Sequence, residues 1–483
     1  MNYNRGIYFR GSQLFIFALL LLLTACTLPH LPTRQVQRLD LKKIQAGQLF
    51  DATALHQEWP GPSWWRQFGD AQLDQLIEQA LRQSPSLHSA AARVSAAAAL
   101  VGGERAALRP QLDAAVQPSY EHFTADEFIP PPYGGNTYWD NQVLLESRFD
   151  LDLWGRHHAL LAAALDRLHV STAESAQASQ VLISTILTSY LRWALNKERT
   201  DYLNALLDTR TQLLALAERR WHVGLGTEIE VNSVAATLPP VQKALARARA
   251  EDTRQRDQIA LLCGLPPAAG EALHAPTLHL STLPLPARIP LRWLGRRPDV
   301  IAARWQVEAD AQDIGAAKAA FYPDISLSAL VGYQALGFSQ LFSNSAHLYG
   351  VLPALSLPLF DGGARQAHLS AAAARRDADV AHYNDTLLRA MQEACDHWAS
   401  LQSLQMEHAA AVHALALARR EEDLARRGQR AGLIAASRPM QATSRRLQRT
   451  QEVADLDFAS LQEQVLLIRA LGGMQTQAAD PHE

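Results

Sequence analysis

The side chains best suited to chemistry lie in two short clusters, and neither has the spacing that catalysis or metal binding requires. Residues 393–397 read Glu-Ala-Cys-Asp-His, and His157 is followed directly by His158. On a helix, the glutamate and histidine of the first cluster share a face while the cysteine points elsewhere, which favours a surface pair over a catalytic dyad. No carboxylate or thiol completes a metal-binding set with the two histidines. Because the sequence also lacks a phosphate-binding loop and a nucleophile elbow, we expect no catalytic residue, no metal and no enzymatic activity.

The amino terminus has the pattern of an export signal with a lipidation site. Arg5 and Arg10 precede an apolar run at 14–23, which is too short to span a bilayer as a helix. The following Leu-Thr-Ala-Cys resembles the bacterial lipobox, so residues 1–25 are predicted to be removed and Cys26 to carry diacylglycerol and an N-acyl chain such as palmitate. The alternative is a general export signal with an incidental cysteine. Thr27 favours delivery to the outer membrane, since Asp at that position holds lipoproteins in the inner membrane.

Composition excludes several classes of protein. The 483 residues carry a net charge of −3, which gives no nucleic-acid footprint. With Cys26 lipidated, only Cys263 and Cys395 remain, and both lie in helical patterns where buried thiols are expected rather than a disulfide framework. No later run of about 20 apolar residues occurs. An outer-membrane protein without spanning helices must use strands or only its lipid anchor.

Four segments alternate between apolar and polar residues, as strands with one face on lipid and one on water would. The first half supplies one stripe of Leu112, Ala114, Val116 and Tyr120 and another of Val143, Leu145, Phe149, Leu151 and Leu153, the latter alternating with Gln142, Glu146, Arg148, Asp150 and Asp152. The second half supplies Ile325, Leu327, Ala329, Val331 and Tyr333, then Val351, Leu355, Leu357 and Leu359. An amphipathic sheet on a soluble core is nearly as consistent with this pattern. The lipobox favours the membrane barrel.

Four strands cannot form a barrel alone. Edge N–H and C=O groups in lipid cost several kcal/mol each, and small barrels need about eight strands. The strands must therefore pair between subunits, and three copies would supply twelve. The residues themselves predict oligomerisation without fixing a trimer.

The remainder of the chain reads as long helices in two copies of one design. Pro85–Pro110 and Pro298–Pro323 are each 25 residues apart and share small residues at matching positions, which indicates a duplicated half. Helical patterns run over about 156–221 and 364–427, break at residues 223–226 and 431–434, and return over about 228–262 and 440–471. Pro239-Pro240 predicts a kink in the first returning helix.

These patterns divide the chain into a signal peptide (1–25), a lipidated extended segment (26–62), a first repeat (63–263), a proline-rich linker (264–290), a second repeat (291–472) and a tail (473–483). Each repeat is predicted to run helix, two strands, long helix, turn, helix. The fold class is mainly α with a membrane β part.

Five motifs, in order, resemble the outer membrane factor or TolC-like family, in its lipoprotein branch. They are Trp64-Trp65-Arg66-Gln67-Phe68-Gly69-Asp70, Phe149-Asp150-Leu151-Asp152-Leu153-Trp154-Gly155-Arg156, Arg296-Arg297-Pro298-Asp299-Val300, Lys318-Ala319-Ala320-Phe321-Tyr322-Pro323 and Leu357-Pro358-Leu359-Phe360-Asp361-Gly362-Gly363. The resemblance implies a homotrimer whose twelve strands form one outer-membrane barrel, continued by an α-helical coiled-coil tunnel across the periplasm. It also implies a periplasmic adaptor (membrane fusion) protein and an inner-membrane transporter as partners.

The resemblance also assigns sites. The turns Val223-Gly224-Leu225 and Ala431-Gly432-Leu433 would contact the adaptor, although any helix hairpin needs Gly. The family places Asp six residues after this Gly, where this chain has Glu230 and Arg438. The charge reversal at Arg438 argues against an acidic gate ring from the second hairpin, so we expect either Glu228 and Glu230 to supply the gate or Arg–Glu pairing to close it.

Barrel residues have two interpretations. Glu146, Arg148, Asp150 and Asp152 would line the lumen, either to keep it wet or to select solutes. Tyr133, Tyr138 and Trp139 would mark the outer interface or cover the barrel mouth, and Trp154 and Phe360 lie at the opposite rim.

Three functions fit the sequence. The favoured one is a passive outer-membrane exit channel for small toxic compounds in a tripartite multidrug efflux system. A protein or peptide export channel and a non-channel lipoprotein scaffold are the alternatives.

Overall fold

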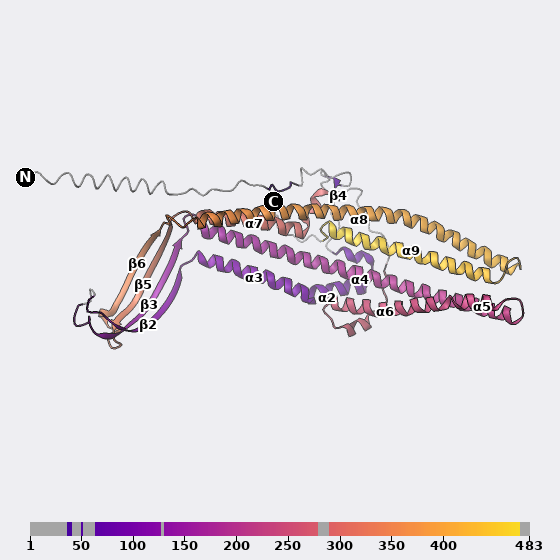
Figure 1. Ribbon diagram of the computed structural model, residues 1–483, viewed down its shortest axis with the longest axis horizontal. Coiled ribbons are helices and arrows are strands. Elements are labelled where there is room, and N and C mark those ends of the chain that lie inside the picture. The colour runs from indigo at the N-terminus through magenta and orange to yellow at the C-terminus, as the bar shows by residue number, and fades with distance from the viewer. Residues whose placement is uncertain (1–35, 41–49, 52–62, 127–129, 279–288, 474–483) are drawn as a thin grey trace, which may run out of the picture. The chain divides into compact units, whose positions relative to one another are not determined.

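The computed structural model describes residues 36–40, 50–51, 63–126, 130–278 and 289–473 (Figure 1). Cys26, the predicted signal peptide and part of the proline-rich linker lie outside these ranges. Within the described residues the chain forms two compact units. The first comprises residues up to 38, 94–170 and 303–383, and the second comprises 39–93, 171–302 and 384 onward.

The first unit contains one antiparallel sheet of two hairpins. Strands β2 (Gln111–His122) and β3 (Thr137–Leu151) form the first hairpin, and β5 (Asp324–Leu336) and β6 (His347–Ser356) form the second. The order is β2-β3-β5-β6, with β3 paired to β5 (Figure 1). Within the described residues of this chain, β2 and β6 are edges with one paired neighbour each. The four predicted strands are therefore present, and the sheet is open.

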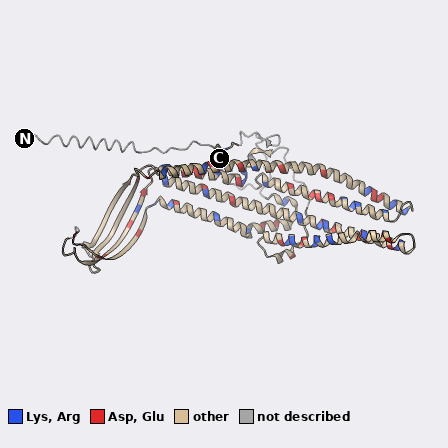
Figure 2. Ribbon diagram, viewed as in Figure 1, with Lys and Arg blue, Asp and Glu red and all other residues tan. Residues whose placement is uncertain are grey.

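The strand register confirms that one face of the sheet is apolar, but it shows that the other face is polar only in part. Val143 faces Val116 and Tyr333, and Leu145 faces Ala114 and Val331, so one face is apolar across all four strands. The opposite face is polar mainly on β2 and β3, because β5 and β6 place Leu330, Leu348 and Leu352 there. Leu357 and Leu359, predicted as strand residues, lie beyond the end of β6. In the ribbon coloured by charge, most charged positions of the sheet lie on β2 and β3 (Figure 2).

Gly332 permits the close approach of β3 and β5. A Cβ on Gly332 would lie 2.0 Å from the carbonyl oxygen of Val143 and 2.9 Å from the Cα of Leu144. No side chain larger than hydrogen fits there without displacing backbone.

Each sheet hairpin is preceded and followed by helices of matching length. Helices α3 (Pro85–Ala107) and α7 (Pro298–Ala319) precede the hairpins. Helices α4 (Arg156–His222) and α8 (Ala364–Arg430) follow them, with 67 residues each. At a rise of 1.5 Å per residue, each reaches about 100 Å. The duplication inferred from the two proline pairs is thus seen in the elements themselves.

The returning helices differ between the repeats. Helix α9 (Ser437–Ala470) is continuous, whereas the first repeat has α5 (Glu228–Ala235) and α6 (Leu238–Leu262). The break coincides with Pro239-Pro240 at the start of α6, which confirms the predicted interruption, since proline lacks an N–H and clashes with the preceding turn. Arg210 Nη1 donates to the carbonyl of Thr237 at 2.6 Å and so binds the chain at this break.

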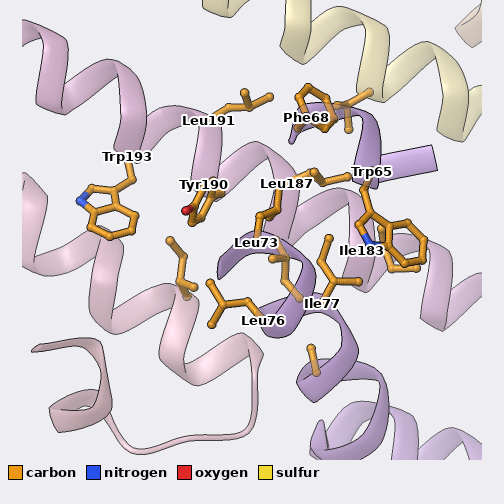
Figure 3. Close-up of a cluster of buried hydrophobic side chains, with 14 of the residues drawn as sticks. Trp65, Phe68, Leu73, Leu76, Ile77, Ile183, Leu187, Tyr190, Leu191 and Trp193 are labelled. Atoms are coloured by element: carbon orange, nitrogen blue, oxygen red, sulfur yellow. The ribbon is translucent and has the colours of Figure 1, made fainter. Parts of the chain in front are cut away.

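The second unit has the main hydrophobic core (Figure 3). The 3₁₀ helix η2 (Trp64–Phe68) and helix α2 (Ala71–Gln83) pack there against α4 and the ends of α6 and α9. Ile77, Ile186 and Tyr190 are fully buried in this cluster. The Trp-Trp segment predicted to open the first repeat is therefore a core element.

Asp70 joins this core to the linker. Its carboxylate caps α2 by accepting from the backbone N–H of Gln72 and Leu73, and it also accepts from Tyr190 Oη and Thr277 N, both at 2.8 Å. Burial alone would raise its pKa, but these hydrogen bonds prevail and hold the pKa of Asp70 below its usual value.

Five short elements complete the described fold. Strands β1 (Phe50–Asp51) and β4 (Ile289–Pro290) pair in parallel. The 3₁₀ helix η3 (Pro267–Ala272) lies within the linker and η4 (Leu291–Arg296) follows it, while η5 (Asn344–Ala346) lies between β5 and β6.

Candidate channel wall and docking turns

Three of the four predicted lumen residues share the polar face of β3. Glu146 lies opposite Asp113, Arg148 opposite Gln111, and Asp150 opposite Ser326. Glu146 and Arg148 are exposed and Asp150 is partly buried. Side chains two residues apart on a strand point to the same side, so these charges form one row that could face water.

Asp152 is an exception, and its prediction as a lumen residue is wrong. It follows β3, and its carboxylate accepts from the backbone N–H groups of His157 at 3.1 Å and His158 at 2.9 Å. Its Oδ2 also lies 2.6 Å from His158 Nδ1. The side chain is thus committed to the start of α4, where an acceptor satisfies N–H groups that have no partner within the helix.

Aromatic side chains lie at both ends of the sheet. At the loop end, Trp139 contacts Tyr120 with ring centroids 5.1 Å apart and Phe338 at 5.5 Å. Tyr133 contacts Tyr138 at 5.8 Å. At the helix end, Trp154 stacks on Tyr322 at 4.7 Å, while Phe360 is 90% exposed. Trp139 and Tyr120 therefore lie on the apolar face, as interfacial aromatics of a membrane sheet do, whereas Tyr138 pairs with Glu121 on the polar face.

The two helix turns have the same backbone design. Gly224 and Gly432 adopt φ of 73° and 71°. The N–H of Leu225 donates to the carbonyl of Arg220, and that of Leu433 to Gly428, both at 2.8 Å. These bonds close each long helix with a Schellman motif, in which glycine takes the left-handed position.

The turns also expose apolar side chains. Val223 is 69% exposed, Leu225 70% and Leu433 79%. A Schellman turn needs none of these side chains outside, so they are free to contact another protein.

The three residues predicted to act at a gate are all exposed, and one of them, Glu230, belongs to the N-terminal cap of α5. Glu230 is the fourth residue of a Thr-x-x-Glu capping box, in which Thr227 Oγ1 accepts from the Glu230 N–H at 3.2 Å. Glu228, Glu230 and Arg438 are all exposed. No ion pair among the described residues joins Arg438 to either glutamate.

A cluster that sequence reasoning missed holds the second hairpin together. Glu422 is 7% exposed and accepts from Thr443, Arg426 and Arg446 at 2.7, 2.6 and 2.6 Å. Burial would raise the pKa of this carboxyl, but the Thr443 hydrogen bond and the two arginines outweigh it and lower the pKa. The Glu-Glu and Arg-Arg doublets at 421–422 and 445–446 were the available signal, because they lie at similar distances from the turn on its two sides and carry opposite charges.

The clusters considered for catalysis have structural partners. His397 Nδ1 lies 2.8 Å from Glu463, and Glu393 pairs with Arg297 at 2.8 Å. The predicted surface pair between Glu393 and His397 is therefore wrong. Cys263 is buried as expected, but Cys395 is exposed, and both are free thiols.

Among the described residues, no group of three or more His, Cys, Asp or Glu side chains could hold a metal ion. In the same residues, no helix has the length and hydropathy required to cross a membrane.

Comparison with known proteins agrees with this architecture. The family model described as "Outer membrane efflux protein" matches residues 76–265 and 290–473. The fusaric acid resistance protein FusA of Burkholderia cepacia is 33% identical over 365 residues, covering 74% of this chain and 68% of FusA. The multidrug resistance outer membrane protein MdtQ of Escherichia coli O6:H1 is 30% identical over 471 residues, covering 95% and 97% of the two chains.

Solved structures show the same fold. The crystal structure of the outer membrane protein VceC from Vibrio cholerae superposes with a TM-score of 0.80 at 31% identity, covering 86% of this chain and 100% of VceC. The outer-membrane channel OprN gives a TM-score of 0.77 at 26% identity. With its open sheet, paired long helices and matched turns, the chain belongs to the outer membrane efflux protein family and has the fold of its TolC-like channels.

Proposed function

We propose that this protein is the exit channel of a tripartite efflux system, passively conducting small toxic compounds, drugs among them, across the outer membrane. An inner-membrane transporter and a periplasmic adaptor would deliver the cargo and supply the energy. The names of FusA and MdtQ, which refer to fusaric acid and multidrug resistance, support small compounds over a secreted protein as cargo.

The single observation that carries the proposal is the open amphipathic sheet. Strands β2 and β6 each lack a second neighbour within the described chain, while one face of the sheet is apolar across every strand. In a membrane, unpaired edges are too costly, so β2 of one copy must pair with β6 of another. Three copies give the twelve strands that the family resemblance implies, and the charges on β3 then line the lumen.

The helices and turns fit the rest of the assembly. Two helices of about 100 Å per chain match a wide aqueous compartment. Val223, Gly224 and Leu225, with Ala431, Gly432 and Leu433, are proposed to contact the adaptor. Their exposed apolar side chains support this role, because apolar groups that cluster on a protein surface commonly mark a site of contact with another protein.

A lipid anchor is proposed at Cys26, which lies outside the described residues. The lipobox supports it, and a chain with two or more acyl groups would stay at the membrane independently of the barrel. Residence in the outer membrane is expected from the family. The covalent lipid is predicted from the lipobox in this sequence.

The function is tested in cells that keep the cognate transporter and adaptor but lack this protein. Expression of the full chain is expected to lower intracellular accumulation of a fluorescent efflux substrate and to raise resistance to the exported compounds. The matched control lacks the transporter, and there the channel should have no effect. Normal accumulation in the deletion strain, together with loss of a secreted protein, would instead support the export of protein.

A further inference from the structure

A basic cavity lies in the first unit beside the ends of the strands. It has a volume of about 410 Å³ and is formed by α4, α7 and α8. Arg156, Arg365, His368 and Arg375 contribute its polar lining, and four alanines form much of the remaining wall. Small residues leave the arginines room that larger side chains would fill.

Basic side chains outnumber carboxylates in the lining of this cavity. Asp313 is the one acidic residue in the lining, and it pairs with Arg167. Asp361 lies 2.8 Å from Arg365 Nε, yet Arg365 Nη1 is buried with no acceptor within the described residues. No ion pair among those residues involves Arg156 or Arg375. Buried donors in proteins normally have acceptors, so the cavity is suited to an anion from outside the chain.

A second cavity of about 210 Å³ adjoins the first, and Arg156 and Ala320 line both. Two carboxylates, Asp152 and Asp324, also line this second cavity. Its lining includes Leu153, Trp154 and Tyr322. Leu153 is 60% exposed, and Leu359 and Phe360, which follow β6, are 50% and 90% exposed. A basic pocket and an apolar collar therefore meet at the periplasmic end of the proposed membrane sheet.

We propose that this pair of cavities binds an anionic phospholipid of the inner leaflet, with the phosphodiester at the arginines and the upper acyl chains on the collar. Guanidinium groups suit phosphate oxygens because they donate paired, charge-assisted hydrogen bonds. A free phosphate would satisfy the arginines but would leave the collar unexplained. The proposal rests on the proposed function, since only a sheet in the outer membrane brings its collar to the lipid interface.

The test measures lipid bound to the detergent-purified full-length protein by native mass spectrometry. The probes are a phosphatidylglycerol, a phosphatidylcholine with the same acyl chains, and inorganic phosphate as competitor. The variant is the double substitution Arg156→Gln/Arg375→Gln, chosen because both side chains are exposed. The control is Arg419→Gln/Arg420→Gln, which removes the same charge from exposed positions on α8 in the second unit.

We expect the wild type and the control to retain phosphatidylglycerol in preference to phosphatidylcholine, and the double variant to bind it about tenfold more weakly. Phosphate at millimolar concentration should not displace the lipid. Equal binding by variant and wild type, equal retention of the two lipids, or displacement by phosphate alone would overturn the proposal. Drug accumulation measured on the same variants separates this outcome from the proposed function, because a conducting channel without the lipid preference would fail only here.

Discussion

Arg297 donates through Nη1 to a carboxylate oxygen of Glu393 at 2.8 Å, so the first residue before α7 is bound to the middle of α8. The same nitrogen donates to the carbonyl of Ala470 at 2.9 Å, and the remaining guanidinium nitrogens hold Asp299 at 2.8 and 3.0 Å. One buried cation thus joins the beginning of the second repeat to the end of its last helix.

Replacing Arg297 with Met is expected to destabilise the second unit by about 2 kcal/mol, because Asp299, Glu393 and the carbonyl of Ala470 lose a buried hydrogen-bond donor. The apparent melting temperature should fall, as followed by circular dichroism. Arg389→Met is the control: Arg389 pairs with Asp385 in an exposed position, where ion pairs contribute little. Equal losses in the two variants would show that the buried position of Arg297 has no special importance.

Asp310 is predicted to make stability depend on pH. It is 5% exposed, and burial, followed by the hydrogen bond and charge of Asp379, raises its pKa to about 7. Below pH 4 the carboxyl is protonated in both the folded and unfolded states. Between about pH 4 and 7 the unfolded state loses the proton first, so stability falls as pH rises.

The variant Asp310→Asn should therefore be more stable than the wild type at pH 8, and the gain should shrink toward pH 5. Melting curves at several pH values measure this directly. Asp385→Asn, at an exposed site, should show no such trend. A gain for Asp310→Asn that stays constant with pH would contradict a raised pKa.

The docking turns are tested by charge at positions where no side chain is displaced. Gly224→Asp and Gly432→Asp place a carboxylate in open space, at equal left-handed φ. We expect increased drug sensitivity with the oligomer intact, because the charge blocks the exposed apolar contact. Gly337→Asp is a matched control, with φ of 78° and open space at the loop end of the sheet. Unchanged sensitivity in the turn variants would remove the docking assignment.

Lipidation is tested by Cys26→Ser. Intact mass and labelling with radioactive palmitate should show acyl chains on the wild type and none on the variant. Cys263→Ser and Cys395→Ser should keep the label, since both thiols lie far from the lipobox in sequence. Label on the Cys26 variant would place the modification elsewhere.

Sequence predicted the regular elements closely, because their signals are local. The expected long helix at 156–221 is α4 at Arg156–His222, since no proline or glycine interrupts the run. Alternation placed the four strands and their apolar face, and Pro239-Pro240 marked the break between α5 and α6. The predictions that failed concerned side chains whose partners lie in other elements of the fold.

Asp152 continues the alternating pattern of β3, but its carboxylate caps α4 because it accepts from backbone N–H groups at the start of that helix. Glu393 meets Arg297, 96 positions away, rather than its helical neighbour His397. The leucines of β5 and β6 on the polar face become visible only with the register. Spacing within one element cannot report such pairings.

The channel itself is tested most directly by electrical recording on the purified full-length protein in planar lipid bilayers. Discrete, reproducible conductance steps are expected, since the charged row of β3 would line a water-filled lumen. Protein that inserts with its sheet intact, yet gives no conductance under any applied voltage or salt, would contradict it.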